Sequence, residues 1–187
     1  MIVVRTAESA EQALTDGSMR CLDRGCGGLL RRWGYGRRRH VRGLNADPIE
    51  VRPRRVRCGG CGTTQVLLPA ALQPRRADTT EVVGTAGLGH RRIAAALGRS
   101  PSTVRRWLRR ARSRDHLNRL WQRGAQALVR MDPEAFNELT ITGNLLRDAL
   151  TVLAAAAWWT QHRLGLTEPV WTLIGLHTGG RLLTPPG

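Results

Sequence analysis

The sequence predicts a mainly α-helical protein with one small β-structured module near its N-terminus. Three observations support this fold class. Four cysteines fall in two pairs within a Gly- and Arg-rich stretch, apolar residues recur at helical spacing on both sides of residue 98, and a longer helical periodicity fills the last third of the chain. With 187 residues, the chain has room for one sizeable core or for two to three small modules. The shifts in composition favour small modules.

The chain divides by composition into five segments. They are an N-terminal segment at 1–19, a Cys-, Gly- and Arg-rich module at 20–69, a linker at 70–78, a helical unit at 79–112 and a helical domain at 113–187. In the first segment, Ile2–Val4 predicts a short strand, and the acidic stretch from Ala7 to Leu14 predicts a helix. We assign no chemistry to this segment.

The four cysteines of the second segment are spaced as C21-x4-C26 and C58-x2-C61, and glycine follows the second cysteine of each pair. A tight turn that aims two thiolates at one point needs such a glycine. We therefore predict that Cys21, Cys26, Cys58 and Cys61 form a closed tetrahedral site for structural zinc. Two disulfides are the first alternative, which a cytosolic redox poise disfavours, and four free thiols are the second, which the paired spacing disfavours.

The first cysteine pair is wider than the second, so His40 is an alternative ligand to Cys21 if the longer loop cannot close. Around the pairs, residues 29–33, 49–57 and 65–68 suggest short antiparallel strands. So small a module buries too little apolar area to fold alone, and a metal would supply much of its folding free energy. The basic run at 37–40 either lies along phosphates or forms a solvated hairpin without contacts.

Residues 79–112 predict three helices. Thr79 can cap a helix at 80–86, and a second helix at 91–97 is followed by Gly98, which suits a left-handed stop. A third helix begins after Ser100, a good N-cap residue, with Pro101 at the position where a missing N–H costs nothing.

The third of these helices has an apolar side and a basic side. Its inward residues fall at helical spacing: Val104, Trp107, Leu108 and Ala111. With Ala94 where two helices would cross and Gly98 in the turn, the segment resembles the helix-turn-helix of bacterial DNA-binding proteins. A solvated arginine-rich face is the alternative, but isolated amphipathic helices rarely combine this small residue, glycine and cap.

This resemblance implies that residues 99–110 are a recognition helix in the major groove of double-stranded DNA, with Ser102, Arg105, Arg106 and Arg109 nearest the base edges. Arginine suits this place because its fork can pair with O6 and N7 of guanine. The expected DNA-binding residues are Arg91, Arg92, Ser100, Ser102, Thr103, Arg105, Arg106, Arg109 and Arg110.

The charge distribution also indicates a polyanionic partner. The formal net charge is +16, and all 30 basic residues are arginine. Residues 20–112 hold 22 of these arginines against 5 acidic residues, whereas the flanking segments are close to neutral. Such localisation distinguishes a nucleic-acid surface from a generally basic protein.

The cysteine pattern followed by the helix-turn-helix pattern resembles the DNA-binding region of bacterial insertion-sequence transposases and of related short uncharacterised proteins. The residues that carry this resemblance are Cys26, Cys58, Cys61, Gly98, Val104 and Trp107. It implies an N-terminal zinc ribbon, a central three-helix helix-turn-helix and a C-terminal helical hairpin or bundle. It also implies a transposon-associated protein or a transcriptional regulator, with a transposase subunit or remnant, or an adaptor that recruits a partner, as alternatives.

No enzymatic motif accompanies these patterns. The 14 acidic residues are scattered, and the sequence has no phosphate-cradling Gly-Lys loop, serine elbow or HExxH motif. We therefore expect no catalytic residues. The start of the chain lacks a basic leader followed by an apolar run, and the apolar run at 149–159 is too short to cross a bilayer. These features predict a cytoplasmic, nucleoid-associated protein without a membrane segment.

The C-terminal third predicts packed helices. One amphipathic helix is expected at about 115–130, and a seam of apolar residues in steps of three and four runs from Phe136 to Ala157. The seam is either the inner side of a helical hairpin or a surface for a homodimer or another protein. Trp158 and Trp159 are adjacent and cannot both point inward, so one of them is a candidate interface residue.

Overall fold

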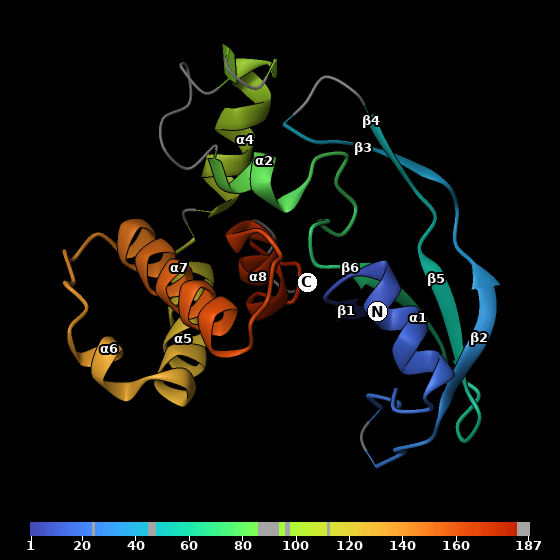
Figure 1. Cartoon of the computed structure of the whole chain (residues 1–187). Coiled ribbons are helices and arrows are strands. Elements are labelled where there is room, and N and C mark those ends of the chain that lie inside the picture. Colours follow the sequence, from blue (N-terminus) through green and yellow to red (C-terminus); the bar gives the residue numbers. More distant parts are fainter. Residues whose placement is uncertain (24, 45–47, 86–93, 96–97, 112, 183–187) are drawn as a thin grey trace.

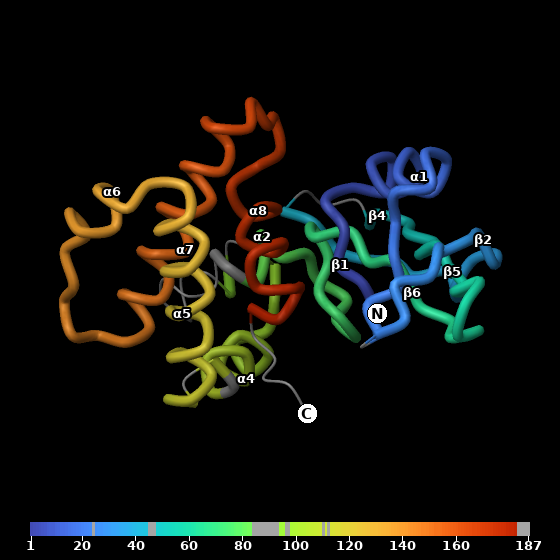
Figure 2. The backbone as a smooth tube through the Cα atoms, turned by 90° about the horizontal axis from the view of Figure 1, so that it is seen from below, coloured from blue at the N-terminus to red at the C-terminus, as the bar shows by residue number. Residues whose placement is uncertain are grey.

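The computed structural model describes residues 1–187 except 24, 45–47, 86–93, 96–97, 112 and 183–187. Figure 1 shows two regions side by side. We call residues 1–72 the sheet region and residues 79–182 the helical region. Figure 2, which gives the view from below, keeps the same separation, with α8 (Val170–His177) on the side that faces the sheet region.

The sheet region is built on one mixed sheet of strand order β1-β6-β5-β2. The β1–β6 pair is parallel, whereas β6–β5 and β5–β2 are antiparallel. A separate antiparallel hairpin joins β3 to β4. The strands are β1 (Ile2–Val4), β2 (Leu30–Tyr35), β3 (Arg39–Arg42), β4 (Pro48–Val51), β5 (Arg54–Cys58) and β6 (Thr64–Pro69).

Helix α1 (Ala7–Thr15) covers one face of this sheet. It begins with a capping box, in which the Thr6 hydroxyl accepts from the Ser9 N–H and the Ser9 hydroxyl accepts from the Thr6 N–H. Ala10 and Leu14 are buried against the sheet. The strand and the helix predicted for the N-terminal segment are thus present. Strand β1 pairs with β6, which follows Cys61, so the N-terminal segment is part of the same sheet.

The helical region contains α2 (Thr80–Thr85), α4 (Pro101–Ala111), α5 (Arg114–Met131), α6 (Pro133–Asn137), α7 (Leu145–Arg163) and α8. Helix α2 begins as predicted, because the Thr79 hydroxyl accepts a hydrogen bond from the Val82 N–H at 3.3 Å. Of the helix predicted at 91–97, Ala94 and Ala95 are helical, and the other residues lie outside the described part of the chain.

The apolar seam predicted from Phe136 onward is divided between two helices. Helix α6 ends at Asn137, and α7 begins at Leu145 after a turn that contains Gly143 with a φ of 80°. Asp148 closes the turn by accepting hydrogen bonds from the backbone N–H groups of Thr142 and Gly143. These backbone N–H groups lie just before α7 and have no partner within the helix, so the Asp148 carboxylate satisfies them. In one continuous helix they would bond to carbonyl groups of the preceding turn.

Most of the seam faces inward. Of the seam residues on α7, Leu153 and Ala157 are fully buried, and Leu146 and Leu150 pack against the same core. Gly124 of α5 lets α7 approach closely, because a Cβ at this position would lie 2.8 Å from a methyl carbon of Val152. The seam is therefore the inner side of an α5–α7 hairpin, as the first of the two interpretations proposed.

One hydrophobic core spans the helix-turn-helix segment and the C-terminal helices. It contains Val82 of α2, Val104 and Trp107 of α4, Leu117 of α5, and Leu173 of α8, all buried. The orientation of α4 is consequently fixed by packing against helices far from it in sequence. None of the described helices is long and apolar enough to cross a membrane.

Candidate nucleic-acid interface and metal centre

The four cysteines come together although 40 residues separate the first from the last. Cys21 and Cys26 lie in the loop before β2, Cys58 ends β5, and Cys61 lies in the turn to β6. All four sulfur atoms lie within 4.8 Å of one another, with 3.7 Å between Cys21 and Cys61 and 3.5 Å between Cys26 and Cys58. A tetrahedral zinc ion with Zn–S bonds of about 2.3 Å requires sulfur atoms about 3.8 Å apart. The four sulfurs fit such a metal site.

Glycines shape the loops around the sulfurs. Gly27 and Gly62 have φ values of 56° and 72°, in the left-handed region that the predicted tight turns require. At Gly28, a Cβ would lie 2.8 Å from the Cys58 sulfur, so a larger residue would displace a ligand. The close approach at Gly28 is not visible from the Cys-Gly pattern.

The thiols differ in acidity because their surroundings differ. Backbone N–H groups of Cys61 and Gly60 lower the pKa of Cys58 to about 6. A backbone N–H at Asp23 lowers the pKa of Cys21, but burial and the neighbouring thiols outweigh it and raise that pKa to about 12. Since neighbouring thiolates repel one another, the four sulfurs can ionise together only around a cation.

Cys21 belongs to this cluster and His40 does not. Among the described residues, the group with metal-ligand geometry consists of the four cysteines. His40 lies on β3, opposite Glu50 of the β3–β4 hairpin. The longer Cys21–Cys26 loop closes, so the alternative ligand is not needed.

Helix α4 is preceded by a well-formed turn. The Arg99 N–H donates to the Ala94 carbonyl at 2.8 Å, and the Gly98 N–H donates to the Ala95 carbonyl at 3.2 Å. With a φ of 56° at Gly98, these bonds make a Schellman motif, the left-handed stop that the sequence predicted. The Ser100 hydroxyl then accepts from the Thr103 N–H at 3.3 Å and caps α4.

The two sides of α4 are divided as predicted. Val104, Trp107 and Ala111 are buried and Leu108 is half-buried. The exposed residues on the other sides include Ser102, Arg105, Arg106 and Arg109. No ion pair between described residues involves Arg105, Arg106 or Arg109. Arg91, Arg92 and the side chain of Arg110 lie outside the described part.

Arg99 differs from the neighbouring arginines. The resemblance implied a recognition helix that starts at residue 99, but α4 starts at Pro101. Arg99 lies before the helix, and its side chain points back into the fold. Its guanidinium Nε lies 2.8 Å from the Asp78 carboxylate, and the two side chains are 12% and 5% exposed. Asp78 also binds Arg42, the last residue of β3, at 3.0 Å. Arg99 therefore anchors the turn to the linker and to the β3–β4 hairpin.

The arrangement of α2, the turn and α4 leads to the comparison with known families. Residues 83–128 match a family model described as a homeodomain-like domain. This homeodomain-like segment fits the predicted helix-turn-helix and continues into α5, beyond the boundary at residue 112. The search of curated proteins and the search of solved structures gave no match. None of these comparisons bears on the resemblance to transposases.

Sequence reasoning missed two exposed aromatic rings on β2 that pack against arginine side chains. Trp33 and Tyr35 are 51% and 48% exposed, and arginine guanidinium groups lie over both rings. In the sequence, R31-R32-W33 is simply a basic run, and we did not assign its side chains to the two faces of a strand. The signal that could have found this is the alternation of side chains along each strand. Leu30 of β2 and Val56 of β5 are buried, so Arg31, Arg55 and Arg57, their neighbours in sequence, lie on the other face.

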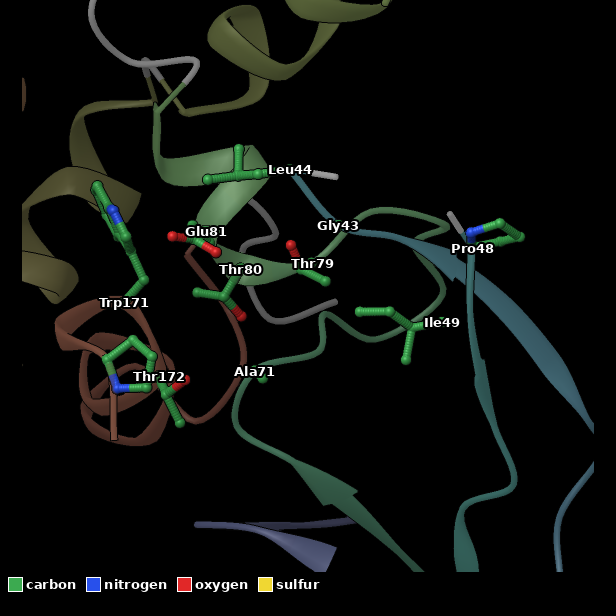
Figure 3. A pocket seen from close by; sticks show the side chains of 11 residues that line it. Gly43, Leu44, Pro48, Ile49, Ala71, Thr79, Thr80, Glu81, Trp171 and Thr172 are labelled. Carbon is green, nitrogen blue, oxygen red and sulfur yellow. The ribbon is translucent and has the colours of Figure 1, made fainter. Parts of the chain in front are cut away.

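A pocket of about 620 Å³ lies where the β3–β4 hairpin, α2 and α8 meet (Figure 3). Leu44, Ile49 and Trp171 contribute apolar surface to its lining. The Thr80 hydroxyl in the lining accepts from the Gln73 amide and donates to the Ala70 carbonyl. This part of the polar lining supports the fold, and we assign no ligand to the pocket.

Proposed function

We propose that this chain is a sequence-specific DNA-binding protein, either transposon-associated or a transcriptional regulator, that reads double-stranded DNA through α4. The observation that carries the proposal is the exposed side of α4, with Arg105, Arg106 and Arg109 in no ion pair between described residues. The homeodomain-like match supports DNA binding by this segment. The role that we propose is binding, without catalysis.

The packing of α4 explains how its arginines would read bases. Val104 and Trp107 are 0% and 4% exposed, and they fix the helix axis against the C-terminal helices. Arginines on the opposite side thus project from a rigid rod, which reduces the ordering cost of a bidentate contact with guanine. The N-terminal part of the helix would contact bases, through Ser102, Arg105, Arg106 and Arg109. Phosphate contacts would come from Arg91, Arg92, Ser100, Thr103 and Arg110.

Zinc is the metal proposed for the four cysteines. Four thiolates at tetrahedral spacing form a closed site with no position for substrate, which is typical of structural zinc. The bound ion would hold the β2–β5 strands and the loops around them together. Its role would be to stabilise the sheet region, not to take part in a reaction.

Selection of preferred sites from random DNA duplexes tests the assignment of α4. Arg105→Ala and Arg106→Ala should each relax the preference at the contacted base and weaken binding by about 1–3 kcal/mol, because a bidentate contact is lost. Arg130→Ala, an exposed arginine at the far end of α5, removes the same charge and is the matched control. If both α4 variants select the same sites as the unaltered chain, the assigned reading surface is wrong.

A second candidate function is that of an adaptor, whose C-terminal helices recruit another protein or a second copy. Trp158 favours it, because this side chain is 46% exposed on α7 and stacks on His162 at 3.8 Å. Salt dependence separates the two functions. A protein that neutralises six or more phosphates loses about a thousandfold in affinity between about 50 and 200 mM salt, whereas a pure adaptor shows little change. Nicking of plasmid DNA that depends on a divalent metal would instead indicate an enzyme.

A further inference from the structure

The sheet formed by β2 and β5 has one face covered by α1 and one face open. Val56 is buried beneath α1, and Arg32, its cross-strand partner, binds Glu11 of that helix. Side chains alternate between the faces of a strand. We call the opposite side, made by Arg31 and Trp33 of β2 and by Arg55 and Arg57 of β5, the outer sheet face.

Two arginines lie directly opposite each other on the outer sheet face. Arg31 of β2 pairs in register with Arg57 of β5. Like charges at directly opposed positions destabilise a sheet. No ion pair between described residues involves Arg31, Arg55 or Arg57, so no described carboxylate offsets this repulsion. The arrangement fits a surface whose counter-charge comes from a bound anion.

On this face, the Trp33 ring helps to hold the Arg57 guanidinium group in place. The Arg57 guanidinium lies 4.7 Å from the centre of the Trp33 ring, and its Nε donates to the Gly62 carbonyl at 3.2 Å. A cation held in this way remains available to a phosphate on its outer side. Because the guanidinium occupies a face of the ring, the site offers charge rather than an open platform for stacking a base. This favours a phosphate backbone over single-stranded bases.

Two arginines of the basic run at 37–40, for which the sequence left phosphate contacts or a solvated hairpin open, have partners within the fold. Arg38 pairs with Glu50 at 3.0 Å, and Arg39 donates to the Arg76 carbonyl. On the outer sheet face, by contrast, Arg31, Arg55 and Arg57 pair with no described carboxylate. The outer sheet face is therefore a better candidate for phosphate contacts than the β3–β4 hairpin.

We propose that the outer sheet face binds phosphates of the same DNA duplex that α4 reads, as a second contact that is independent of base sequence. This inference rests on the proposed function of α4. Figures 1 and 2 show α4 and the β2–β5 pair at separate places in both views. The protein would therefore contact the duplex backbone at a distance from the bases that it reads, and its footprint would be longer than that of a helix-turn-helix alone.

The test compares two double variants with equal loss of charge in the full-length, metal-loaded protein. One is Arg31→Gln with Arg57→Gln, and the other is Arg130→Gln with Arg147→Gln, two exposed arginines of the helical region. Affinity is measured against salt for the selected duplex and for a random duplex. Each lost phosphate contact lowers the slope of log affinity against log salt by about 0.9, so the first variant should lose about two on both duplexes, with site preference unchanged. The control should keep its slope.

An unchanged slope in Arg31→Gln with Arg57→Gln would overturn the proposal, and so would weaker binding confined to single-stranded oligonucleotides. If the salt slope stays while Arg105→Ala still relaxes site preference, the outer face fails and the proposed function stands. If the unaltered protein binds no duplex, the proposed function itself fails. A second variant, Arg31→Gln with Arg55→Gln, leaves the Arg57 hydrogen bond in place and decides the matter if the first does not fold. Its melting temperature should equal or exceed that of the unaltered protein, because a like-charge pair is removed.

Discussion

The sheet region and the helical region each hold arginines on a surface, but they fix them by different means. In the sheet region, the main buried cluster is small and includes Cys21 and Cys58 among its apolar residues. In the helical region, the core runs through α2, α4, α5, α7 and α8 and includes the large side chains of Trp107 and Leu153. We expect the first region to depend on a bound metal for its stability, whereas apolar burial stabilises the second.

The difference also appears in the ion pairs. In the sheet region, Arg32 and Arg54 both bind Glu11 of α1. The pKa of the Glu11 carboxyl group is lowered, chiefly by the hydrogen bond from Arg54. On α4, Arg105, Arg106 and Arg109 form no ion pair with a described residue, and the buried side of the helix holds them in place. A helix packed on a large apolar core can leave its arginines free for a ligand. The sheet region has a smaller core, and some of its arginines form ion pairs that stabilise the fold.

Metal removal should have the largest effect on this comparison. Structural zinc contributes about 10–16 kcal/mol of apparent binding free energy in small zinc modules at neutral pH. Chelation, or Cys58→Ser, should therefore abolish protection of backbone amides over residues 20–69 and leave α5 and α7 protected. Hydrogen exchange measured by mass spectrometry checks this, with zinc-saturated chelator as the control. Retained protection over residues 20–69 would refute the metal site.

Leu153→Ala should have the next largest effect, now confined to the helical region. Leu153 is fully buried between α7 and its neighbours, and removing such a side chain costs about 2–5 kcal/mol through lost burial and a remaining cavity. Leu164→Ala makes the same chemical change at a residue that is 58% exposed and should cost far less. Urea unfolding followed by far-UV circular dichroism gives both values. Equal losses in the two variants would contradict the core described for this region.

Gly175→Ala should have a smaller effect that reaches both regions. A Cβ at Gly175 of α8 would overlap the Ala70 carbonyl oxygen, which already accepts a hydrogen bond from the Thr80 hydroxyl. Overpacking of this kind costs about 1–3 kcal/mol. We expect faster amide exchange at the end of β6 and at the start of α2 together.

Gly59→Ala is the matched control for this junction. A Cβ there would meet its nearest atom at 3.7 Å, an ordinary contact, and Gly59 has no positive φ. This variant should leave amide exchange in both regions unchanged. If Gly175→Ala is equally silent, α8 does not join the two regions in the way the structure indicates.

The helix ends and the cysteine site were readable from sequence because short-range chemistry decides them. The caps at Thr79 and Ser100 and the left-handed stop at Gly98 are local events, and all three are present. The pairing of Cys21 with a partner 40 residues away followed from valence, since four thiolates can share one metal. Residue type and spacing were enough in these places.

What the sequence did not predict depends on contacts between distant segments. The ion pair of Arg99 with Asp78 uses inside the fold the first arginine of the segment expected as the recognition helix, and the local sequence does not identify Asp78 as its partner. Likewise, the register that sets Arg31 opposite Arg57 is decided by the turns and by the buried face of the sheet. Only the tertiary structure decides which arginines are used internally and which face outward.

The pH dependence of stability should show the smallest effect, and it should arise in the helical region. Burial lowers the pKa of His116 and His177 below the ordinary value of 6.5. His116 lies 3.0 Å from the Leu182 carbonyl, and His177 lies 3.1 Å from the Thr160 hydroxyl. The unfolded chain binds more protons than the folded one below about pH 6.5, so stability is full above that pH and falls as the pH decreases, by at most about 1.4 kcal/mol per pH unit for each histidine.

Urea unfolding at about pH 7.5 and at about pH 5.5 measures this loss. A variant that combines His116→Gln with His177→Gln should show a smaller difference between the two pH values than the unaltered protein. Thr160→Val removes the hydroxyl beside His177 but keeps the imidazole buried, so it should retain the difference. Equal stability of the unaltered protein at both pH values would show that the two imidazoles reach water when protonated. The helical region would then be held less tightly around α8 than its buried core implies.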